Sequence, residues 1–327
     1  MAVETFASAP EPESAPELAS APEPESAPGP ASAPGPASKS RTAPLDRQFI
    51  HLRQGVTLAV SHTAPASTVC PTSWQSASPQ PPTPPLVFLH GGLGNRYNWR
   101  VQYEFTQAQG WEALNYDLAG HGESSHYQRY SIGRHQRDLT RLLQHFHITS
   151  PILCCHSYGV PIGLEWAQRH QAAGLVLVAG GTHDLAPWWE IPLMKGLEWG
   201  GRHLFHWEWL QRQTKTLSSR VEHEVIDRFL EESPVPTAAE PYGALSIFWG
   251  YNYFERRRFK KIKVPVLVIS GGQDSMFSQE MGEALAAIFP RGEHLHLPKA
   301  GHLMIAEYPE IVNSAIADFV EKIAASQ

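Results

Sequence analysis

The five residues Cys155-His156-Ser157-Tyr158-Gly159 carry the strongest structural signal in the sequence. They stand between an apolar run at 151–155, which has the length of a buried strand, and the start of a helical pattern. A serine on such a sharp strand-to-helix turn holds its hydroxyl above the sheet, provided that small residues two positions before and after it let the turn close. Gly159 meets this requirement, whereas Cys155 stands where glycine is usual. The motif predicts a nucleophilic Ser157; the alternative is an ordinary helix N-cap.

Strand-like and helix-like segments alternate on both sides of this motif. A β-hairpin is predicted at 49–62, with its turn at Gln54-Gly55. The remaining strands are predicted at 86–89, 112–118, 151–155, 174–179, 265–270 and 294–297, and the helices at 132–146, 160–170, 278–288 and 306–323. Strands that alternate with helices predict an α/β fold, a mostly parallel sheet with helices on both faces.

A serine nucleophile needs a base, and the base needs a carboxylate that orients it. Asp274 and His302 each follow a predicted strand, and the order Ser157, Asp274, His302 along the chain is the order used on this architecture. The carboxyl ends of parallel strands meet at one edge of the sheet, where such chemistry gathers. These three residues are therefore the predicted catalytic set, and Asp184, which follows the strand at 174–179, is the competing carboxylate.

An oxyanion formed during acyl transfer would need two backbone N–H donors. One is expected from Tyr158, directly after the nucleophile, where the start of a helix directs amide groups outward. The other is expected from Gly92, in the glycine-rich loop at 90–94. That loop matches no nucleotide-binding glycine pattern. Neither a metal nor an organic cofactor is expected.

Taken together, these motifs resemble the α/β-hydrolase superfamily, most closely the abhydrolase-domain proteins, over about residues 46–325. The matching stretches, in the order of the family, are 90–94, 117–124, 156–159, 271–274 and 300–302. The resemblance implies a serine hydrolase with esterase, lipase, thioesterase, C–C hydrolase or perhydrolase activity. It also implies a structural role for the turn at 117–124, including His121. Epoxide hydrolases and haloalkane dehalogenases of this fold use aspartate where this chain has Ser157.

A long segment at 182–258 interrupts the alternation, and the resemblance implies that it forms a helical cap over the active site. It contains six of the ten tryptophans of the chain. Large aromatic side chains can line an apolar ligand pocket, although most of them are expected to pack the cap onto the core. The composition of this segment favours a fairly apolar ester or acyl substrate over a sugar or a highly charged molecule.

Residues 1–44 form a repetitive tail, in which the octet APEPESAP occurs at 9–16 and again at 21–28. Proline, alanine, glutamate and serine without large apolar side chains cannot bury enough surface to fold, so the tail is predicted to be disordered. The net charge of −6 arises within residues 1–38, which hold six glutamates and no lysine or arginine. Residues 39–327 hold 26 acidic and 26 basic residues, and this electrical balance argues against nucleic-acid binding. A single catalytic domain is predicted at 45–327.

Targeting signals are not visible in the sequence. No apolar run approaches the ~18–20 residues of a membrane span, and no secretory signal precedes the tail. Three cysteines are too few for a disulfide framework, so a reducing compartment, the cytoplasm, is expected. Two of them, Cys154 and Cys155, are adjacent and are predicted to point to opposite faces of a strand.

The hypothesis that these observations favour is a serine hydrolase that cleaves a carboxylic ester or related acyl bond through an acyl-enzyme. Two alternatives stay open. The same three residues could cleave a C–C bond or carry out perhydrolase-type chemistry, or the fold could bind a ligand without turnover. Acyl chain length, natural substrate and oligomeric state are not indicated by the sequence.

Overall fold

The structure is a computed structural model that describes residues 44–52, 55–65, 83–92, 94–181, 196 and 259–326. The predicted tail, apart from Pro44, lies outside the described residues. So does the predicted cap, apart from Gly196, and with it the competing carboxylate Asp184. The described residues comprise the sheet, the helices that surround it and the loops that join them.

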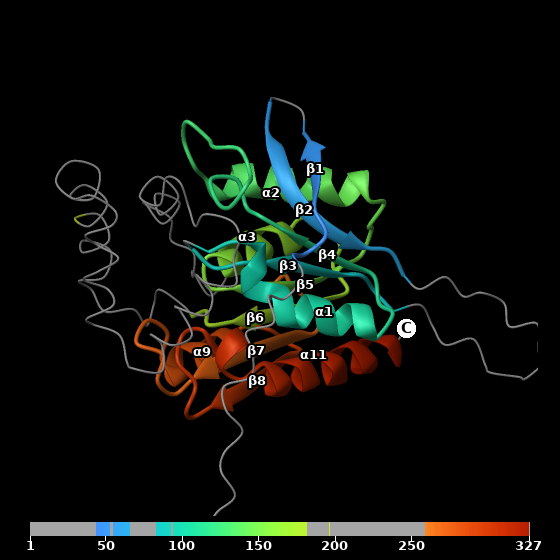
Figure 1. Cartoon of the computed structure of the whole chain (residues 1–327). Coiled ribbons are helices and arrows are strands. Elements are labelled where there is room, and N and C mark those ends of the chain that lie inside the picture. Colours follow the sequence, from blue (N-terminus) through green and yellow to red (C-terminus); the bar gives the residue numbers. More distant parts are fainter. Residues whose placement is uncertain are drawn as a thin grey trace, which may run out of the picture. The chain divides into compact units, whose positions relative to one another are not determined.

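An eight-stranded sheet organises the described residues, with the strand order β1-β2-β4-β3-β5-β6-β7-β8 (Figure 1). Its strands are β1 (Gln48–His51), β2 (Thr57–Thr63), β3 (Leu86–Leu89), β4 (Ala113–Tyr116), β5 (Ile152–His156), β6 (Gly174–Val178), β7 (Val266–Gly271) and β8 (Gly292–Leu297). β2 pairs antiparallel with both β1 and β4, and all other neighbours are parallel. The predicted hairpin and the predicted mostly parallel sheet are both confirmed.

Helices cover both faces of this sheet, which explains why its inner strands are continuous apolar runs rather than alternating ones. They are η1 (Arg96–Trp99), α1 (Arg100–Ala108), α2 (Ile132–His145), α3 (Gly159–Ala167), α9 (Gln279–Ala286), α10 (Met304–Glu307) and α11 (Pro309–Ala324). On one face α1 contacts α11, and on the other α2 packs against α3 (Figure 1). All residues of β3, β5, β6 and β7 are buried.

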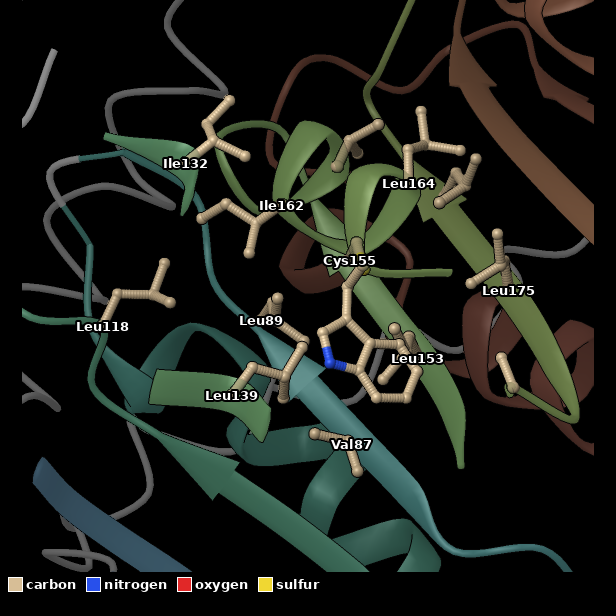
Figure 2. Packing of buried hydrophobic residues seen from close by; sticks show 14 of the residues in the cluster. Val87, Leu89, Leu118, Ile132, Leu139, Leu153, Cys155, Ile162, Leu164 and Leu175 are labelled. Carbon is tan, nitrogen blue, oxygen red and sulfur yellow. The ribbon is translucent and has the colours of Figure 1, made fainter. Parts of the chain in front are cut away.

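The buried side chains form two hydrophobic clusters, one on each face of the sheet. Figure 2 shows the cluster beneath α2 and α3, in which Leu89 and Cys155 of the sheet meet Leu139 and Ile162 of the helices. Cys154 belongs to the other cluster, with the side chains of α11. The prediction that the adjacent cysteines point to opposite faces is confirmed, and both are free thiols.

Two features of the helices differ from the predictions. The helix expected at 306–323 is broken at Tyr308, because the residue before a proline avoids the helical conformation and Pro309 then starts α11. The helix α1 was not predicted, because its buried face includes polar residues and gives little apolar periodicity. Gln102 of that face is buried and donates a hydrogen bond to the carbonyl of Ile305 at 3.0 Å.

None of the helices within the described residues has both the length and the apolarity that a membrane span requires.

Candidate active site

Ser157 lies on the tight turn between β5 and α3, and its backbone has the unusual φ of +46°. A positive φ is costly for a residue with a side chain, so the surrounding structure must hold it in place. The amide of Ser157 donates to the carbonyl of Val178 at 2.9 Å, and the carbonyl of Ser157 accepts from the amide of Val160 at 2.9 Å. Gly159 completes the turn, because a Cβ there would lie 2.6 Å from the carbonyl oxygen of Leu89.

Cys155 occupies the position of the turn where glycine is usual, and α3 compensates for its size. The Sγ of Cys155 lies over Gly163, where an added Cβ would fall within 3.0 Å of the sulfur, a distance that real Cβ atoms do not adopt. The sulfur of Cys155 in the strand thus occupies space that the Cβ of a larger residue would fill at Gly163 in the helix. Burial raises the pKa of the Cys155 thiol well above its ordinary value, so this thiol stays protonated.

The three predicted catalytic side chains lie in one hydrogen-bonded row. The Nε2 of His302 is 3.1 Å from the Oγ of Ser157, and its Nδ1 is 3.0 Å from the Oδ2 of Asp274. The side chain of Asp274 is fully buried, whereas that of His302 is 19% exposed. The structure therefore brings together residues that are 145 and 28 positions apart in the sequence.

The carboxylate of Asp274 is held by backbone as well as by the histidine. Its Oδ1 accepts hydrogen bonds from the amides of Met276 at 2.8 Å and Phe277 at 3.0 Å. Burial acts to raise the pKa of Asp274, but the adjacent His302 and these hydrogen bonds outweigh it, so the pKa lies below its ordinary value. The carboxylate consequently stays ionised and leaves Oδ2 to the imidazole.

Glycines let the two loops that carry Asp274 and His302 approach each other. A Cβ on Gly271 would collide with the carbonyl of Ala300, and one on Gly272 with that of Pro298. The amide of Gly272 donates to the carbonyl of Leu297 at 2.9 Å. The two glycines before Asp274 thus fix the distance across which its carboxylate reaches the imidazole.

Two further residues hold the histidine loop. The carboxylate of Glu307 accepts hydrogen bonds from the amides on either side of His302, at 2.7 Å from Gly301 and 3.1 Å from Leu303. The ring of Phe277 stacks against the imidazole with a centroid distance of 5.9 Å. The backbone and one ring face of His302 are therefore both fixed.

His156 connects the serine turn to the histidine loop. Its Nε2 lies 2.9 Å from the backbone carbonyl of His302, and because a carbonyl can only accept, this nitrogen carries the proton. Burial, with a smaller contribution from His302, lowers the pKa of His156 to about 3, so the ring is neutral. Within the described part of the chain, its buried Nδ1 has no hydrogen-bond partner.

The loop with the predicted oxyanion residue Gly92 lies against the other predicted one, Tyr158. A Cβ on Gly92 would be 3.5 Å from the Cβ of Tyr158. His90 braces this loop, since its Nδ1 donates to the carbonyl of Gly91 at 2.7 Å and its Nε2 accepts from the amide of Leu118 at 2.9 Å. Among the described residues, none accepts a hydrogen bond from the amide of Gly92.

The side chain of Tyr158 is anchored away from the serine, in a buried group of aromatic rings. Its hydroxyl lies 3.0 Å from the Nε2 of His135, and its ring meets that of His121 edge to face. Burial lowers the pKa of His121 and of His135 to about 3, so both rings are neutral. The packing fixes the backbone of Tyr158 while leaving its side chain in the core.

The turn at 117–124 is held by a buried ion pair. The carboxylate of Asp117 accepts a hydrogen bond from the guanidinium of Arg96 at 2.5 Å and from the amide of Glu123 at 2.9 Å. His121 in the same turn is buried, with its Nδ1 3.3 Å from the carbonyl of Ala119. These contacts show what holds the turn, in keeping with the structural role that the resemblance implied.

Comparison with known proteins identifies the family. The sequence pattern of the α/β hydrolase fold matches residues 84–309, most of the described sheet and all the residues of the hydrogen-bonded row. The chain belongs to the α/β-hydrolase fold family. It is 25% identical over 249 residues to the uncharacterized hydrolase YugF of Bacillus subtilis, an alignment that covers 72% of this chain and 89% of YugF.

Other members of the family are similar to a comparable degree. The sn-1-specific diacylglycerol lipase ABHD11 of Mus musculus is 23% identical over 253 residues, with 72% of this chain and 81% of the lipase covered. Among solved structures, an esterase from Thermogutta terrifontis has a TM-score of 0.61 and 22% identity, and covers 85% of this chain and 99% of the esterase. By family, the chain is a hydrolase of the α/β fold with a small-molecule substrate.

Sequence reasoning missed three residues that shape the site of this α/β hydrolase: His156, Glu307 and Phe277. Each contacts His302 or its loop from a position outside the motif that contains His302, so the motif itself does not reveal it. Glu307 alone had a usable signal, an acidic residue five positions after the histidine at the start of a predicted helix. Among the described residues, no group of three or more His, Cys, Asp or Glu side chains is arranged to hold a metal ion.

Proposed function

We propose that this α/β hydrolase cleaves a carboxylic ester or related acyl bond through an acyl-enzyme on Ser157. The observation that carries the proposal is the row of hydrogen bonds from Ser157 Oγ through His302 to Asp274, with distances of 3.1 and 3.0 Å. Such a row can remove the serine proton as the hydroxyl attacks, and can hold the resulting imidazolium in place.

In the first half-reaction, His302 Nε2 takes the proton of Ser157 as Oγ bonds to the acyl carbon. The C–O bond to the alcohol then breaks, and the departing oxygen takes that proton from His302. In the second half-reaction, a water molecule gives a proton to His302 and attacks the acyl carbon. The acid leaves, and Ser157 Oγ recovers the proton.

Two features support this role for the imidazole. Asp274 stays ionised because its pKa lies below the ordinary value, so a negative charge faces the imidazolium when it forms. The Nδ1 of His302 must carry a proton to donate to Asp274, which leaves Nε2 as the base that faces Ser157.

The developing oxyanion is assigned to the backbone amides of Gly92 and Tyr158. Tyr158 directly precedes α3, at whose start the aligned peptide dipoles favour negative charge. The Gly92 amide is left without an acceptor among the described residues, as an oxyanion donor requires. Removing one such donor in other acyl-transfer enzymes costs about 10²–10³ in kcat.

The substrate class rests on the sequence. The tryptophan-rich segment at 182–258 favours a fairly apolar acyl or alcohol group, if it forms the cap that the family implies. We further propose that residues 45–327 are the catalytic domain, that the tail at 1–44 is not needed for turnover, and that the enzyme acts in the cytoplasm.

Labelling with a fluorophosphonate probe tests the nucleophile. The full chain should be labelled, Ser157→Ala should not, and the exposed-serine control Ser326→Ala should be labelled like the wild type. A panel of p-nitrophenyl esters of increasing acyl length then tests the bond and the apolar preference. No labelling of the wild type, or equal labelling of Ser157→Ala, would contradict the proposal. Labelling without ester turnover would favour the C–C or perhydrolase alternative.

A further inference from the structure

A cavity lined by none of the catalytic candidates lies beside α2. It has a volume of about 470 Å³, within the range of roughly 300–1,000 Å³ that is usual for small-molecule sites. Its lining includes Gly55 of the β1–β2 turn, Tyr127 of the loop before α2, and four charged residues of the helix: Arg134, Arg137, Asp138 and Arg141. Nothing in the proposed hydrolysis uses this cavity.

The positive charge of the cavity comes from one side of α2. Arg134, Arg137 and Arg141 follow one another at intervals of three and four residues, so they share a face of the helix. The guanidinium of Arg134 lies over the ring of Tyr127, 5.2 Å from the ring centroid. Within the described ranges, no carboxylate lies within ion-pair distance of Arg134 or Arg137.

Asp138 is an acidic side chain beside these arginines, and it is buried. The residue is 4% exposed, and its Oδ2 has no hydrogen-bond partner in the part of the chain that the structure describes. Burial raises the pKa of Asp138 to about 7, even though Arg141 acts to lower it. A buried carboxyl without a partner is costly, and a ligand in the cavity that bonds to it would remove that cost.

We propose that this cavity binds a phosphate monoester that also carries a free hydroxyl group. The guanidinium groups of Arg134 and Arg137 would bind the phosphate, with the positive charge of Arg141 beside them, and Asp138 would bond to the hydroxyl. Phosphate is favoured over carboxylate because a phosphate monoester carries a charge of about −1.5 to −2 and presents three terminal oxygens to these cations.

The arrangement explains why a carboxyl group lies among three arginines. A site for inorganic anions alone would gain nothing from Asp138, whose ionised form repels them. A site for a phosphorylated alcohol needs cationic groups that bind the phosphate and a polar group, here Asp138, that bonds to the hydroxyl. This site does not depend on the proposed hydrolysis, since a catalytically dead Ser157→Ala chain should bind the same ligand equally well.

Isothermal titration of the full chain with glycerol 2-phosphate tests the site, with inorganic phosphate and glycerol as comparison ligands. Saturable binding of glycerol 2-phosphate is expected, with weaker binding of inorganic phosphate and none of glycerol. Arg137→Gln should weaken glycerol 2-phosphate binding at least about tenfold, because a charged guanidinium contact is lost. The matched control is Arg169→Gln, an exposed arginine that does not line the cavity, which should bind like the wild type.

Asp138→Asn separates the two halves of the proposed site. It should leave the binding of inorganic phosphate unchanged or stronger while reducing the preference for glycerol 2-phosphate. Sedimentation with vesicles that contain lysophosphatidic acid, whose headgroup carries both a phosphate monoester and a free hydroxyl, distinguishes a lipid source of the phosphate from a soluble one. Arg137-dependent binding in either arm supports the site. Absence of saturable binding up to about 10 mM in both arms, or equal losses in Arg137→Gln and Arg169→Gln, would overturn it.

Discussion

The pairing of Cys155 with Gly163 makes a quantitative prediction about the serine turn. Gly163→Ala would normally stabilise a helix interior by about 1 kcal/mol. Here the new Cβ would collide with the Sγ of Cys155, and overpacking of this kind costs about 1–3 kcal/mol. The expected net effect in the wild-type background is therefore a loss of about 0–2 kcal/mol.

Removing the sulfur should reverse the sign of that effect. In a Cys155→Ala background, the methyl of Gly163→Ala would lie 3.8 Å from the Cβ of residue 155 and 3.8 Å from the Cδ1 of Leu153, ordinary contact distances. The helix propensity then acts alone, and Gly163→Ala should stabilise by about 1 kcal/mol. The double-mutant cycle predicts a coupling energy equal to the overpacking cost, about 1–3 kcal/mol.

Urea unfolding followed by circular dichroism measures all four chains of the cycle. Gly133→Ala in α2 is the matched control, because the atom nearest to its new Cβ is 3.6 Å away, and its effect should be the same in both backgrounds. If Gly163→Ala changes the free energy of unfolding equally in both backgrounds, within about 0.5 kcal/mol, Cys155 does not depend on the space at Gly163 and the steric explanation is wrong.

Three further predictions concern the candidate site, the cavity beside α2 and the tail. His156→Leu removes a neutral hydrogen bond to the carbonyl of His302 and should lower kcat about 2–10-fold with KM unchanged. His156→Gln, which can still donate a hydrogen bond, should lower kcat less. A change in KM alone would show that His156 does not position the imidazole. The pKa of Asp138 is raised to about 7 in the folded state, so the wild type should lose stability relative to Asp138→Asn as pH rises from about 4 to 7, with no further loss above pH 7. Thermal melts of both chains from pH 4 to 8 measure this, and a difference in Tm that does not change with pH would refute it. Deleting residues 1–44 should leave ester turnover within about twofold, and a larger fall in kcat would show that the tail contributes to the site.

The sheet could be predicted because its strands are buried on both faces. β3, β5, β6 and β7 are continuous apolar runs bounded by proline or glycine, and each was placed within about two residues. The helix α1 was not predicted, because part of its buried face is polar. It buries Arg100, Gln102 and Thr106, whose burial depends on partners that no local pattern reveals.

Some residues of the candidate site could likewise be predicted from the sequence and others could not. Ser157, Asp274 and His302 follow strands and stand in glycine-containing motifs, so the sequence could nominate them. His156 could not be nominated, and Glu307 was indicated only by an acidic residue at the start of a predicted helix, because what both do is hold a loop through backbone groups. The bond from His156 to the carbonyl of His302 crosses 146 residues, and Glu307 binds amides that any residue would supply.

Close backbone contacts at three glycines help to set the geometry of the hydrogen-bonded row. Gly159 admits the carbonyl of Leu89, and Gly271 and Gly272 admit the carbonyls of the histidine loop. A Cβ at any of these positions would push apart two segments that carry site residues. The row of hydrogen bonds tolerates little such movement, since bonds of this kind weaken steeply as geometry departs from the ideal. The glycines therefore constrain where the three side chains lie, although they contribute no atom to the row of hydrogen bonds.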